Sequence, residues 1–318
     1  MRNYVAQIGR FALSAVVTLS VTASALSQAS LRTAMDYDED GKADFTIFRP
    51  VNNTWYIAKS GGGIIGSQFG LASEDFQTPG DFDGDGKGDI AVWRNDTGIW
   101  YWLSSLDGTF NAAQFGALND EPVARDYTGD GRTDYAVVRR TNGQLIWYIL
   151  NIANSNFSAI QWGLSNDFTA PGDYDGDGKF DVCVQRPGST PTAQATFYAL
   201  KSSDNNLLAV QWGLSNDLVV SADYDGDGKT DFAVVRDGVI NLTWYILKST
   251  GGFLGVEFGL KESDVNVQND YDGDGKADVA VWRDPNGTFY YLRSSDGGFV
   301  AFQWGLPNDY PVASYDTH

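Results

Sequence analysis

The sequence predicts an all-β fold made of six similar units, and two observations support this prediction. A nine-residue acidic motif, DYDGDGKFD at residues 173–181, has recognisable copies that begin at residues 36, 81, 126, 223 and 270. The copies follow one another at intervals of 45, 45, 47, 50 and 47 residues, and strand-like rather than helical segments lie between them. A near-constant interval of this length is typical of repeat architectures, in which each repeat forms one structural unit.

A short apolar segment that ends in arginine follows each motif. In residues 89–94 (DIAVWR), large apolar side chains fill one face, and the other face carries a small residue and another apolar one. A strand that is apolar on both faces is buried on both, so we expect sheets packed between sheets. The six segments are residues 44–49, 89–94, 134–139, 181–186, 231–236 and 278–283.

The rest of each repeat predicts three further strands. A turn such as Asn142-Gly143 supplies the positive φ that tight hairpins need, and an aromatic strand such as 147–150 (WYIL) follows it. Another turn leads to a strand that ends in a triplet such as Gln161-Trp162-Gly163, and a short segment such as 122–124 then enters the next motif. Each repeat therefore has four antiparallel strands, with the acidic motif between the first and the second.

Six four-stranded units without intervening helices predict a closed six-bladed β-propeller of four-stranded antiparallel blades. A propeller buries both faces of each blade against its neighbours. We assign residues 30–318 to this single domain. A seven-bladed ring or an open repeat array is the alternative, although an open array would need polar caps at its ends, and the terminal repeats show none.

The two ends of the repeat region predict how the ring closes. Residues 31–35 occupy the first-strand position of repeat 1, but residues 311–315 form a seventh first-strand segment near the C-terminus. Six blades need only six first strands. We therefore expect the C-terminal segment to pair within the first blade and to displace or flank residues 31–35.

The acidic motif fits a calcium site. Carboxylates at positions 1, 3, 5 and 9 supply hard oxygen ligands, and the glycine at position 6 permits a sharp turn. Two carboxylates about 4 Å apart repel by roughly 1 kcal/mol in water and about 4 kcal/mol at an effective dielectric of about 20. Without a cation such a loop would splay, so we interpret the motif as a Ca²⁺ loop rather than a solvated acidic turn, and we expect six ions.

Composition supports this interpretation. The formal net charge is −19, and 24 of the 41 acidic residues lie in the six motifs. Six Ca²⁺ ions would neutralise much of this charge, so the acidity mainly represents metal ligands. A strongly acidic chain is not expected to bind nucleic acid.

The N-terminus predicts export. Residues 1–29 combine Arg2 and Arg10 with an apolar run from Phe11 to Val21 and small residues beyond it, which is the pattern of a signal peptide. We expect a secreted, periplasmic or cell-surface protein without a membrane span, and a monomer. The single cysteine, Cys183, excludes an intramolecular disulfide, so bound calcium would provide the cross-links. Cys183 is expected to be a small core side chain.

The repeats resemble FG-GAP or VCBS repeats, the units of the integrin α-subunit propeller and of many exported bacterial proteins. The matching features are the aromatic-glycine pair Trp162-Gly163, the Pro171-Gly172 pair before the loop, the nine-residue loop and the apolar strand after it. The resemblance covers about residues 31–316. It implies a calcium-stabilised propeller that serves adhesion or ligand recognition, most often without catalysis.

The resemblance also implies the metal ligands, which are the side chains at positions 1, 3, 5 and 9 and the carbonyl at position 7. These residues are Asp36, Asp38, Asp40, Lys42, Asp44, Asp81, Asp83, Asp85, Lys87, Asp89, Asp126, Thr128, Asp130, Arg132, Asp134, Asp173, Asp175, Asp177, Lys179, Asp181, Asp223, Asp225, Asp227, Lys229, Asp231, Asp270, Asp272, Asp274, Lys276 and Asp278. Two loops depart from the pattern, because Thr128 replaces an aspartate and Glu39 replaces a glycine. We expect the loop with Thr128 to bind calcium most weakly.

Three functions are compatible with the sequence. The leading hypothesis is a non-enzymatic module that binds a protein or a surface, and the second is a lectin-like binder of extracellular glycans. The lectin hypothesis would use aromatic platforms among Trp93, Trp100, Trp102, Trp282, Tyr290 and Tyr291. The third is a polysaccharide-active enzyme with a carboxylate pair. Histidine catalysis is almost excluded, because the only histidine is His318 at the terminus.

Two further features bear on these hypotheses. An arginine recurs at the end of the strand that follows each motif, and we expect ion pairs between blades or toward the loops, with a ring that holds a carboxylate or sugar as the alternative. These residues are Arg49, Arg94, Arg139, Arg186, Arg236 and Arg283. Residues 187–196 form the longest deviation from the repeat and are a candidate ligand contact.

Overall fold

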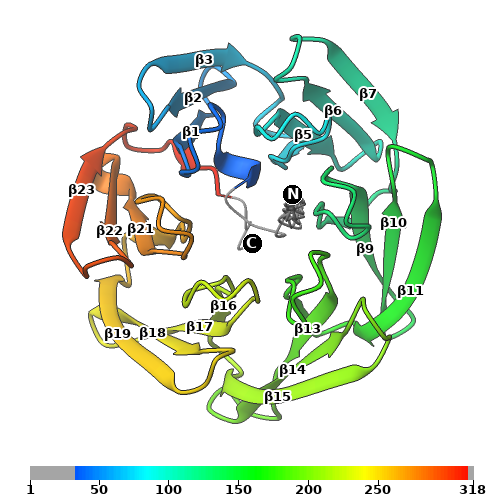
Figure 1. Ribbon diagram of the computed structural model, residues 1–318, viewed down its shortest axis with the longest axis vertical. Coiled ribbons are helices and arrows are strands. Elements are labelled where there is room, and N and C mark those ends of the chain that lie inside the picture. Colours follow the sequence, from blue (N-terminus) through cyan, green and yellow to red (C-terminus); the bar gives the residue numbers. More distant parts are fainter. Residues whose placement is uncertain (1–32, 314–318) are drawn as a thin grey trace, which may run out of the picture.

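The computed structural model describes residues 33–313 and has the predicted all-β architecture. Six four-stranded antiparallel sheets stand around a central axis as the blades of a propeller (Figure 1). The closed ring of six blades confirms the predicted fold, so the seven-bladed and open alternatives are wrong for this part of the chain. The segment assigned as a signal peptide, residues 1–29, lies outside the described residues.

Each blade contains an inner strand, a second, a third and an outer strand. The inner strands are β24 (Tyr310–Pro311), β4 (Asp75–Gln77), β8 (Glu121–Pro122), β12 (Phe168–Thr169), β16 (Leu218–Val219) and β20 (Asp264–Asn266). The second strands are β1 (Phe45–Arg49), β5 (Ile90–Arg94), β9 (Tyr135–Thr141), β13 (Val182–Arg186), β17 (Phe232–Asp237) and β21 (Val279–Arg283). The third strands are β2 (Thr54–Ala58), β6 (Ile99–Leu103), β10 (Gln144–Leu150), β14 (Gln194–Leu200), β18 (Asn241–Leu247) and β22 (Thr288–Leu292). The outer strands are β3 (Ile64–Gln68), β7 (Phe110–Gln114), β11 (Phe157–Leu164), β15 (Leu207–Leu214), β19 (Phe253–Leu260) and β23 (Phe299–Gln303).

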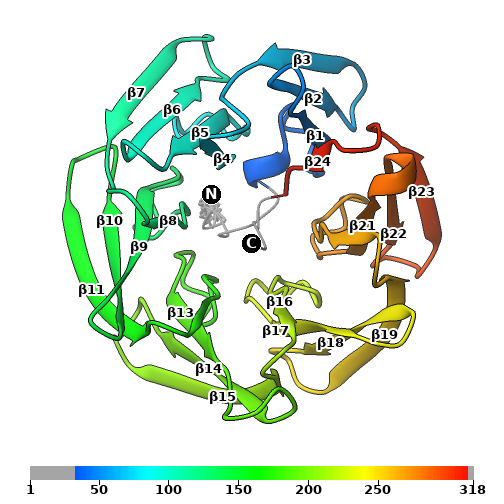
Figure 2. The same ribbon diagram turned by 180° about the vertical axis from the view of Figure 1, so that it is seen from behind.

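The C-terminal strand closes the ring as predicted. β24 completes the first blade by pairing with β1, so that Pro311 faces Ile47 and Tyr310 faces Phe48 (Figure 2). Thr33–Met35 forms a short 3₁₀ helix instead of an inner strand. The remainder of the two competing segments, residues 31–32 and 314–315, lies outside the described residues.

Buried aromatic side chains hold neighbouring blades together. The third strands contribute fully buried rings at one equivalent position, such as Trp55, Trp100 and Trp147. In three repeats the tryptophan of the Trp-Gly pair bonds across the blade interface, because its indole N–H donates to a carbonyl of the next blade. These bonds run from Trp162 to Tyr198 (2.9 Å), from Trp212 to Tyr245 (3.1 Å) and from Trp304 to Tyr56 (3.0 Å). The last of them spans the closure between the sixth and first blades.

Among the described residues, no helix has the length and apolar character of a membrane span. The two 3₁₀ helices, Thr33–Met35 and Asp284–Asn286, have three residues each.

Candidate metal centre

The acidic motifs form six loops between the inner and second strands, numbered here 1 to 6 in chain order. In loop 2 (residues 81–89), the carboxylate of Asp81 accepts the backbone N–H groups of Gly84 (2.6 Å) and Gly86 (2.9 Å). Both glycines have positive φ values, of 77° and 88°, which glycine adopts at little cost. The first aspartate therefore fixes the turn, and positions 4 and 6 both adopt a conformation that favours glycine.

The aspartate at position 9 joins the loop to the hairpin between the third and outer strands. In loop 2, Asp89 accepts the N–H of Phe82 and the N–H of Ser105, each at 2.7 Å. Four other loops repeat the bond from the hairpin at 2.7 Å, from Ser60 to Asp44, Ser202 to Asp181, Ser249 to Asp231 and Ser294 to Asp278. The loops and these hairpins thus share one end of the propeller.

Burial makes these carboxylates costly to ionise. Desolvation is the largest cause that raises the pKa of Asp89 to about 7 and that of Asp44 to about 6. The same cause raises the pKa of Asp134, Asp181, Asp231 and Asp278 to about 7. At position 1, burial raises the pKa of Asp81 and Asp173 to about 6. A bound cation would remove this cost, because it favours the charged form.

Five loops bring three carboxylates close enough to share a metal ion. One oxygen from each member of these groups lies within 4.8 Å of the others: Asp36, Asp38 and Asp40; Asp81, Asp83 and Asp85; Asp173, Asp175 and Asp181; Asp223, Asp225 and Asp231; Asp270, Asp272 and Asp278. The Oδ1 atoms of Asp38, Asp175 and Asp225 are buried and accept no hydrogen bond within the described structure. A buried carboxylate oxygen normally has a partner, and hard oxygens of this kind suit Ca²⁺.

Loop 3 (residues 126–134) is not among these groups. Thr128 stands at position 3, and the side-chain nitrogen of Asn151 lies 2.5 Å from its hydroxyl and 2.7 Å from Asp130 Oδ2. Sequence reasoning identified the Thr128 departure but missed Asn151. The signal was present, because the third repeat has Asn151-Ile152 where the other repeats have Lys, Ser or Arg followed by Ser.

The loops form a continuous ring around the propeller axis. In every loop the N–H at position 8 donates to the carbonyl at position 1 of the preceding loop. The six bonds are Ala43 to Asp270 (2.7 Å), Gly88 to Asp36 (2.8 Å), Thr133 to Asp81 (2.6 Å), Phe180 to Asp126 (2.9 Å), Thr230 to Asp173 (2.6 Å) and Ala277 to Asp223 (2.7 Å). Neighbouring sites are therefore coupled through the backbone.

Side chains at position 7 add to this coupling. The aliphatic part of the lysine or arginine packs over the position 4 glycine of the preceding loop, so that a Cβ on Gly84 would lie 2.9 Å from Arg132. Glu39 replaces this glycine in loop 1 with a φ of 62°, and Lys87 Nζ lies 3.9 Å from its Oε2. In loop 1, Glu39 thus replaces the packing of a side chain over glycine with a long ion pair to Lys87.

The repeated arginines lie at the opposite end of the blades. Each pairs with a buried aspartate just before or at the start of the inner strand of its own blade, at 2.7 to 2.8 Å, and lies 4.5 to 4.9 Å from a tyrosine ring centre. The pairs are Arg49–Asp309, Arg94–Asp75, Arg139–Asp120, Arg186–Asp167, Arg236–Asp217 and Arg283–Asp264. Our expectation of interblade or loop-facing pairs is wrong. The missed signal is an aspartate 19 residues before the arginine in five repeats.

The aromatic platforms proposed for glycans are mostly core residues. Trp93, Trp100, Trp102, Trp282 and Tyr291 are all buried, and the ring of Tyr290 lies against Arg283. The prediction of glycan platforms is therefore wrong for the five buried residues, whereas Tyr290 is half-exposed. Cys183 is buried and free, which confirms that it is a core side chain.

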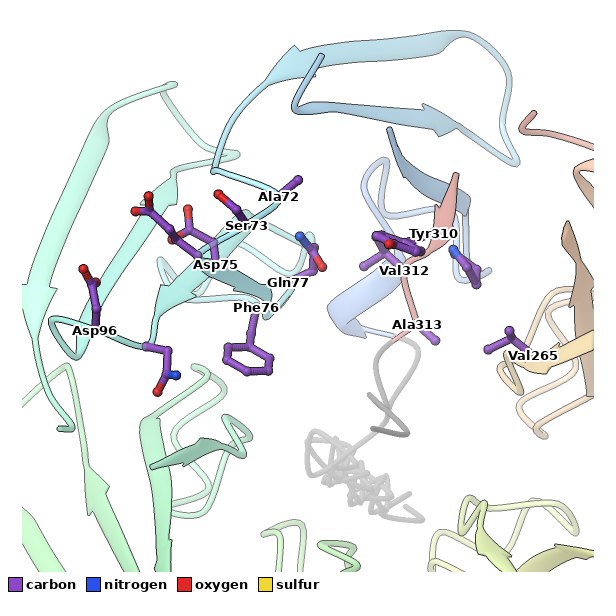
Figure 3. A pocket seen from close by; sticks show the side chains of 13 residues that line it. Ala72, Ser73, Asp75, Phe76, Gln77, Asp96, Val265, Tyr310, Val312 and Ala313 are labelled. Atoms are coloured by element: carbon purple, nitrogen blue, oxygen red, sulfur yellow. The ribbon is translucent and has the colours of Figure 1, made fainter. Parts of the chain in front are cut away.

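A cavity opens beside the inner strands at the arginine end of the propeller. It has a volume of about 550 Å³, and Phe76, Gln77, Val265 and Tyr310 contribute to its lining (Figure 3). Tyr310 is 55% exposed and Val265 is 42% exposed. Residues 187–196, the other candidate ligand contact, form the hairpin between β13 and the start of β14 and do not line this cavity.

Comparison with known proteins identifies the repeats. Residues 126–184, from loop 3 to the second strand of the fourth blade, match the model of the FG-GAP-like repeat. The chain is a six-bladed β-propeller that contains an FG-GAP-like repeat. No curated protein matches its sequence.

Solved structures with similarity to this FG-GAP propeller are distant. One is regucalcin, a calcium-binding protein from Agrobacterium tumefaciens, with 12% identity, coverage of 71% of this chain and 72% of that chain, and a TM-score of 0.40. Another is a putative 6-phosphogluconolactonase from Bacteroides fragilis, with 12% identity, coverage of 87% and 97%, and a TM-score of 0.40. Similarity at this level does not bear on function.

Proposed function

We propose that this FG-GAP propeller is an exported, calcium-stabilised and non-enzymatic module that binds a protein or a surface. Calcium in the acidic loops fixes the blades at one end of the ring, and the other end contacts the partner. The chemistry of the loops supports the metal, the N-terminal sequence supports export, and the apolar side chains around the axis support a binding face.

The observation that carries the metal assignment is the unpaired carboxylate oxygen at position 3. Asp38, Asp175 and Asp225 each place a buried Oδ1 within an acidic group without a hydrogen-bond donor. A buried acceptor without a hydrogen-bond donor costs about 1–3 kcal/mol or more. Three equivalent acceptors of this kind are therefore not expected in loops that bind no cation. Ca²⁺ takes six to eight oxygen ligands and would use these atoms directly.

Apolar side chains at the arginine end support the binding face. The residue after the paired aspartate begins or adjoins the inner strand, and in three blades it is a half-exposed apolar residue, Phe168 (46%), Leu218 (47%) or Val265 (42%). Tyr310 occupies the same position in the first blade and Phe76 in the second. Only the third blade differs, with Glu121. An apolar ring of this kind is a typical protein-contact surface.

Paired variants test this proposal. Phe168→Ser/Leu218→Ser should abolish capture of the partner from native cell-surface extracts, while Val51→Ser, at an 88% exposed hairpin position, should leave it intact. The natural protein, the double variant and Val51→Ser should all bind calcium equally. Equal capture by the double variant would overturn the binding face without affecting the metal assignment.

A lectin remains the second candidate because the cavity in Figure 3 combines an exposed ring with amides. Tyr310 could stack on a sugar, and Gln77 and Asn95 could bond its hydroxyl groups. A glycan array with no hits would exclude this function. The polysaccharide-active enzyme stays a prediction, which would gain support only from saccharide turnover that one Asp or Glu substitution outside the loops abolishes.

A further inference from the structure

Loop 3 contains a side chain that the other loops lack. The amide of Asn151 comes from the hairpin of the third blade and is 1% exposed. Its nitrogen lies 2.5 Å from Thr128 Oγ1 and 2.7 Å from Asp130 Oδ2. Calcium binds oxygen ligands at about 2.3–2.6 Å, so the amide nitrogen occupies the place that a cation between positions 3 and 5 would take.

The orientation of this amide is fixed by a third contact. The backbone N–H of Asn154 donates to Asn151 Oδ1 at 2.9 Å. The carbonyl end of the amide therefore points to the hairpin and the –NH₂ end points into the loop. Its two N–H groups match the two acceptors, and a nitrogen that carries two protons cannot coordinate a metal.

We propose that Asn151 replaces the cation in loop 3, so that the chain binds five calcium ions and closes its sixth loop with an amide. The proposal rests on the proposed calcium function of the other loops. It explains why Thr128 stands at position 3, since a hydroxyl accepts the neutral amide donor without the charge of a carboxylate.

The hairpin shows the same specialisation. In the hairpin of the second blade, the hydroxyls of Ser104 and Ser105 donate to two carboxylates of loop 2, Asp83 Oδ2 (2.7 Å) and Asp85 Oδ1 (2.9 Å). A hydroxyl can rotate away or coordinate a cation through its oxygen. Ile152 stands where Ser105 does, and it offers no hydroxyl to the carboxylates.

The closed loop also anchors its neighbours. Thr133 N–H donates to the carbonyl of Asp81, and Phe180 N–H donates to the carbonyl of Asp126. Loop 3 is thus bonded on one side to loop 2 and on the other to loop 4. An amide that cannot dissociate keeps this part of the ring assembled when calcium is low.

Counting bound ions tests the proposal. Native mass spectrometry of the calcium-loaded protein should give five ions. Thr128→Asp/Asn151→Ser/Ile152→Ser should give six. The reciprocal variant of loop 2, Asp83→Thr/Ser104→Asn/Ser105→Ile, should give four and serves as the matched control. Six ions in the natural chain, or no gain in the first variant, would overturn the proposal. The natural chain binding none would instead overturn the proposed calcium function.

A second readout does not depend on calcium. The side-chain NH₂ signal of Asn151, assigned in ¹⁵N spectra by its loss in Asn151→Ser, should exchange with solvent at least about tenfold more slowly than that of an exposed asparagine. It should do so with and without calcium. Rapid exchange in the calcium-loaded protein would overturn the placement of the amide even if no loop bound a metal.

Discussion

Loops 2 and 3 are neighbours in the ring, and they reach the same backbone conformation by different means. In both loops the first aspartate accepts the N–H groups of positions 4 and 6, at 2.6 and 2.9 Å. They differ in the group that the hairpin presents to the loop: serine hydroxyls in the second blade, and the Asn151 amide in the third.

The difference separates two roles that the acidic motif combines. The first aspartate and the glycines form the turn through backbone hydrogen bonds, in loop 2 and in loop 3 alike. Carboxylates also converge within each of the five other loops, at positions 1, 3 and 5 in loops 1 and 2 and at positions 1, 3 and 9 in loops 4 to 6, and such a cluster needs positive charge or a hydrogen-bond donor. Loop 3 shows that an amide meets this need, whereas in the other loops we assign it to calcium.

Removal of calcium should have the largest effect. A ligand at about 100 times its Kd stabilises by about 2.7 kcal/mol per site, so five sites together contribute on the order of 10 kcal/mol. Differential scanning calorimetry should show a melting temperature lower by about 20 °C or more in EDTA. Added calcium should restore it. An unchanged melt would contradict the metal-dependent scaffold.

Changing the pH should have the next largest effect. Burial raises the pKa of Asp89 to about 7 and that of Asp44 to about 6, from an ordinary value of 3.8. The calcium-free folded chain therefore binds more protons than the unfolded chain between about pH 4 and 7, so its stability falls as the pH rises through this window. Calcium competes with these protons, so its affinity should rise with pH up to about 7.

Melting curves from pH 4.5 to 8 check this sign. The calcium-free protein should melt at a higher temperature at pH 5 than at pH 8, and the calcium-loaded protein should not show this loss. Asp134 of loop 3 has a pKa raised to about 7 by the same burial. The pH should thus affect loops 2 and 3 alike, while calcium distinguishes them. If the melting temperature of the calcium-free protein rose with pH, it would contradict this prediction.

The sequence was sufficient for the fold because the repeat pattern is redundant. Six copies of the loop and of the strand after it indicate blades, and the extra segment near Pro311 indicates the closure that β24 makes. The side-chain pairs within a repeat were harder to predict from the sequence. The Arg94–Asp75 pair joins residues 19 apart through strand register, and Asn151 meets Thr128 only because a hairpin folds over the loop. Neither contact follows from the local motif.

Substitution of the hairpin side chains should have a smaller effect that separates the two loops. Asn151→Ala removes the buried donor that bonds half-buried Thr128 and exposed Asp130, and it should destabilise the calcium-loaded protein by about 1.5–3 kcal/mol. Ser104→Ala should cost about 1 kcal/mol or less, because calcium still satisfies Asp83. Urea unfolding measures both. Equal losses of stability in the two variants would argue against the proposal that loops 2 and 3 are closed by different groups.

Glu39→Gly should have the smallest effect. Glu39 has a φ of 62°, which costs a non-glycine residue about 1–2 kcal/mol. Glycine removes this strain, but it also raises the conformational entropy of the unfolded chain, which offsets part of the gain in stability. The exposed contact with Lys87, at 3.9 Å, contributes little. Urea unfolding should show a gain below about 1 kcal/mol. A loss above that value would mean that the ion pair matters more than the backbone.

Hydrogen exchange of loops 2 and 3 in one molecule tests the central claim most directly. With calcium, the amides of Gly84, Gly86 and Ser105 in the second blade and those of Gly129 and Gly131 in the third should all be protected. In EDTA at neutral pH, we predict that the first group exchanges at least about tenfold faster, while the second changes by less than about twofold. Equal loss of protection in both loops would contradict the account, and so would full protection of both.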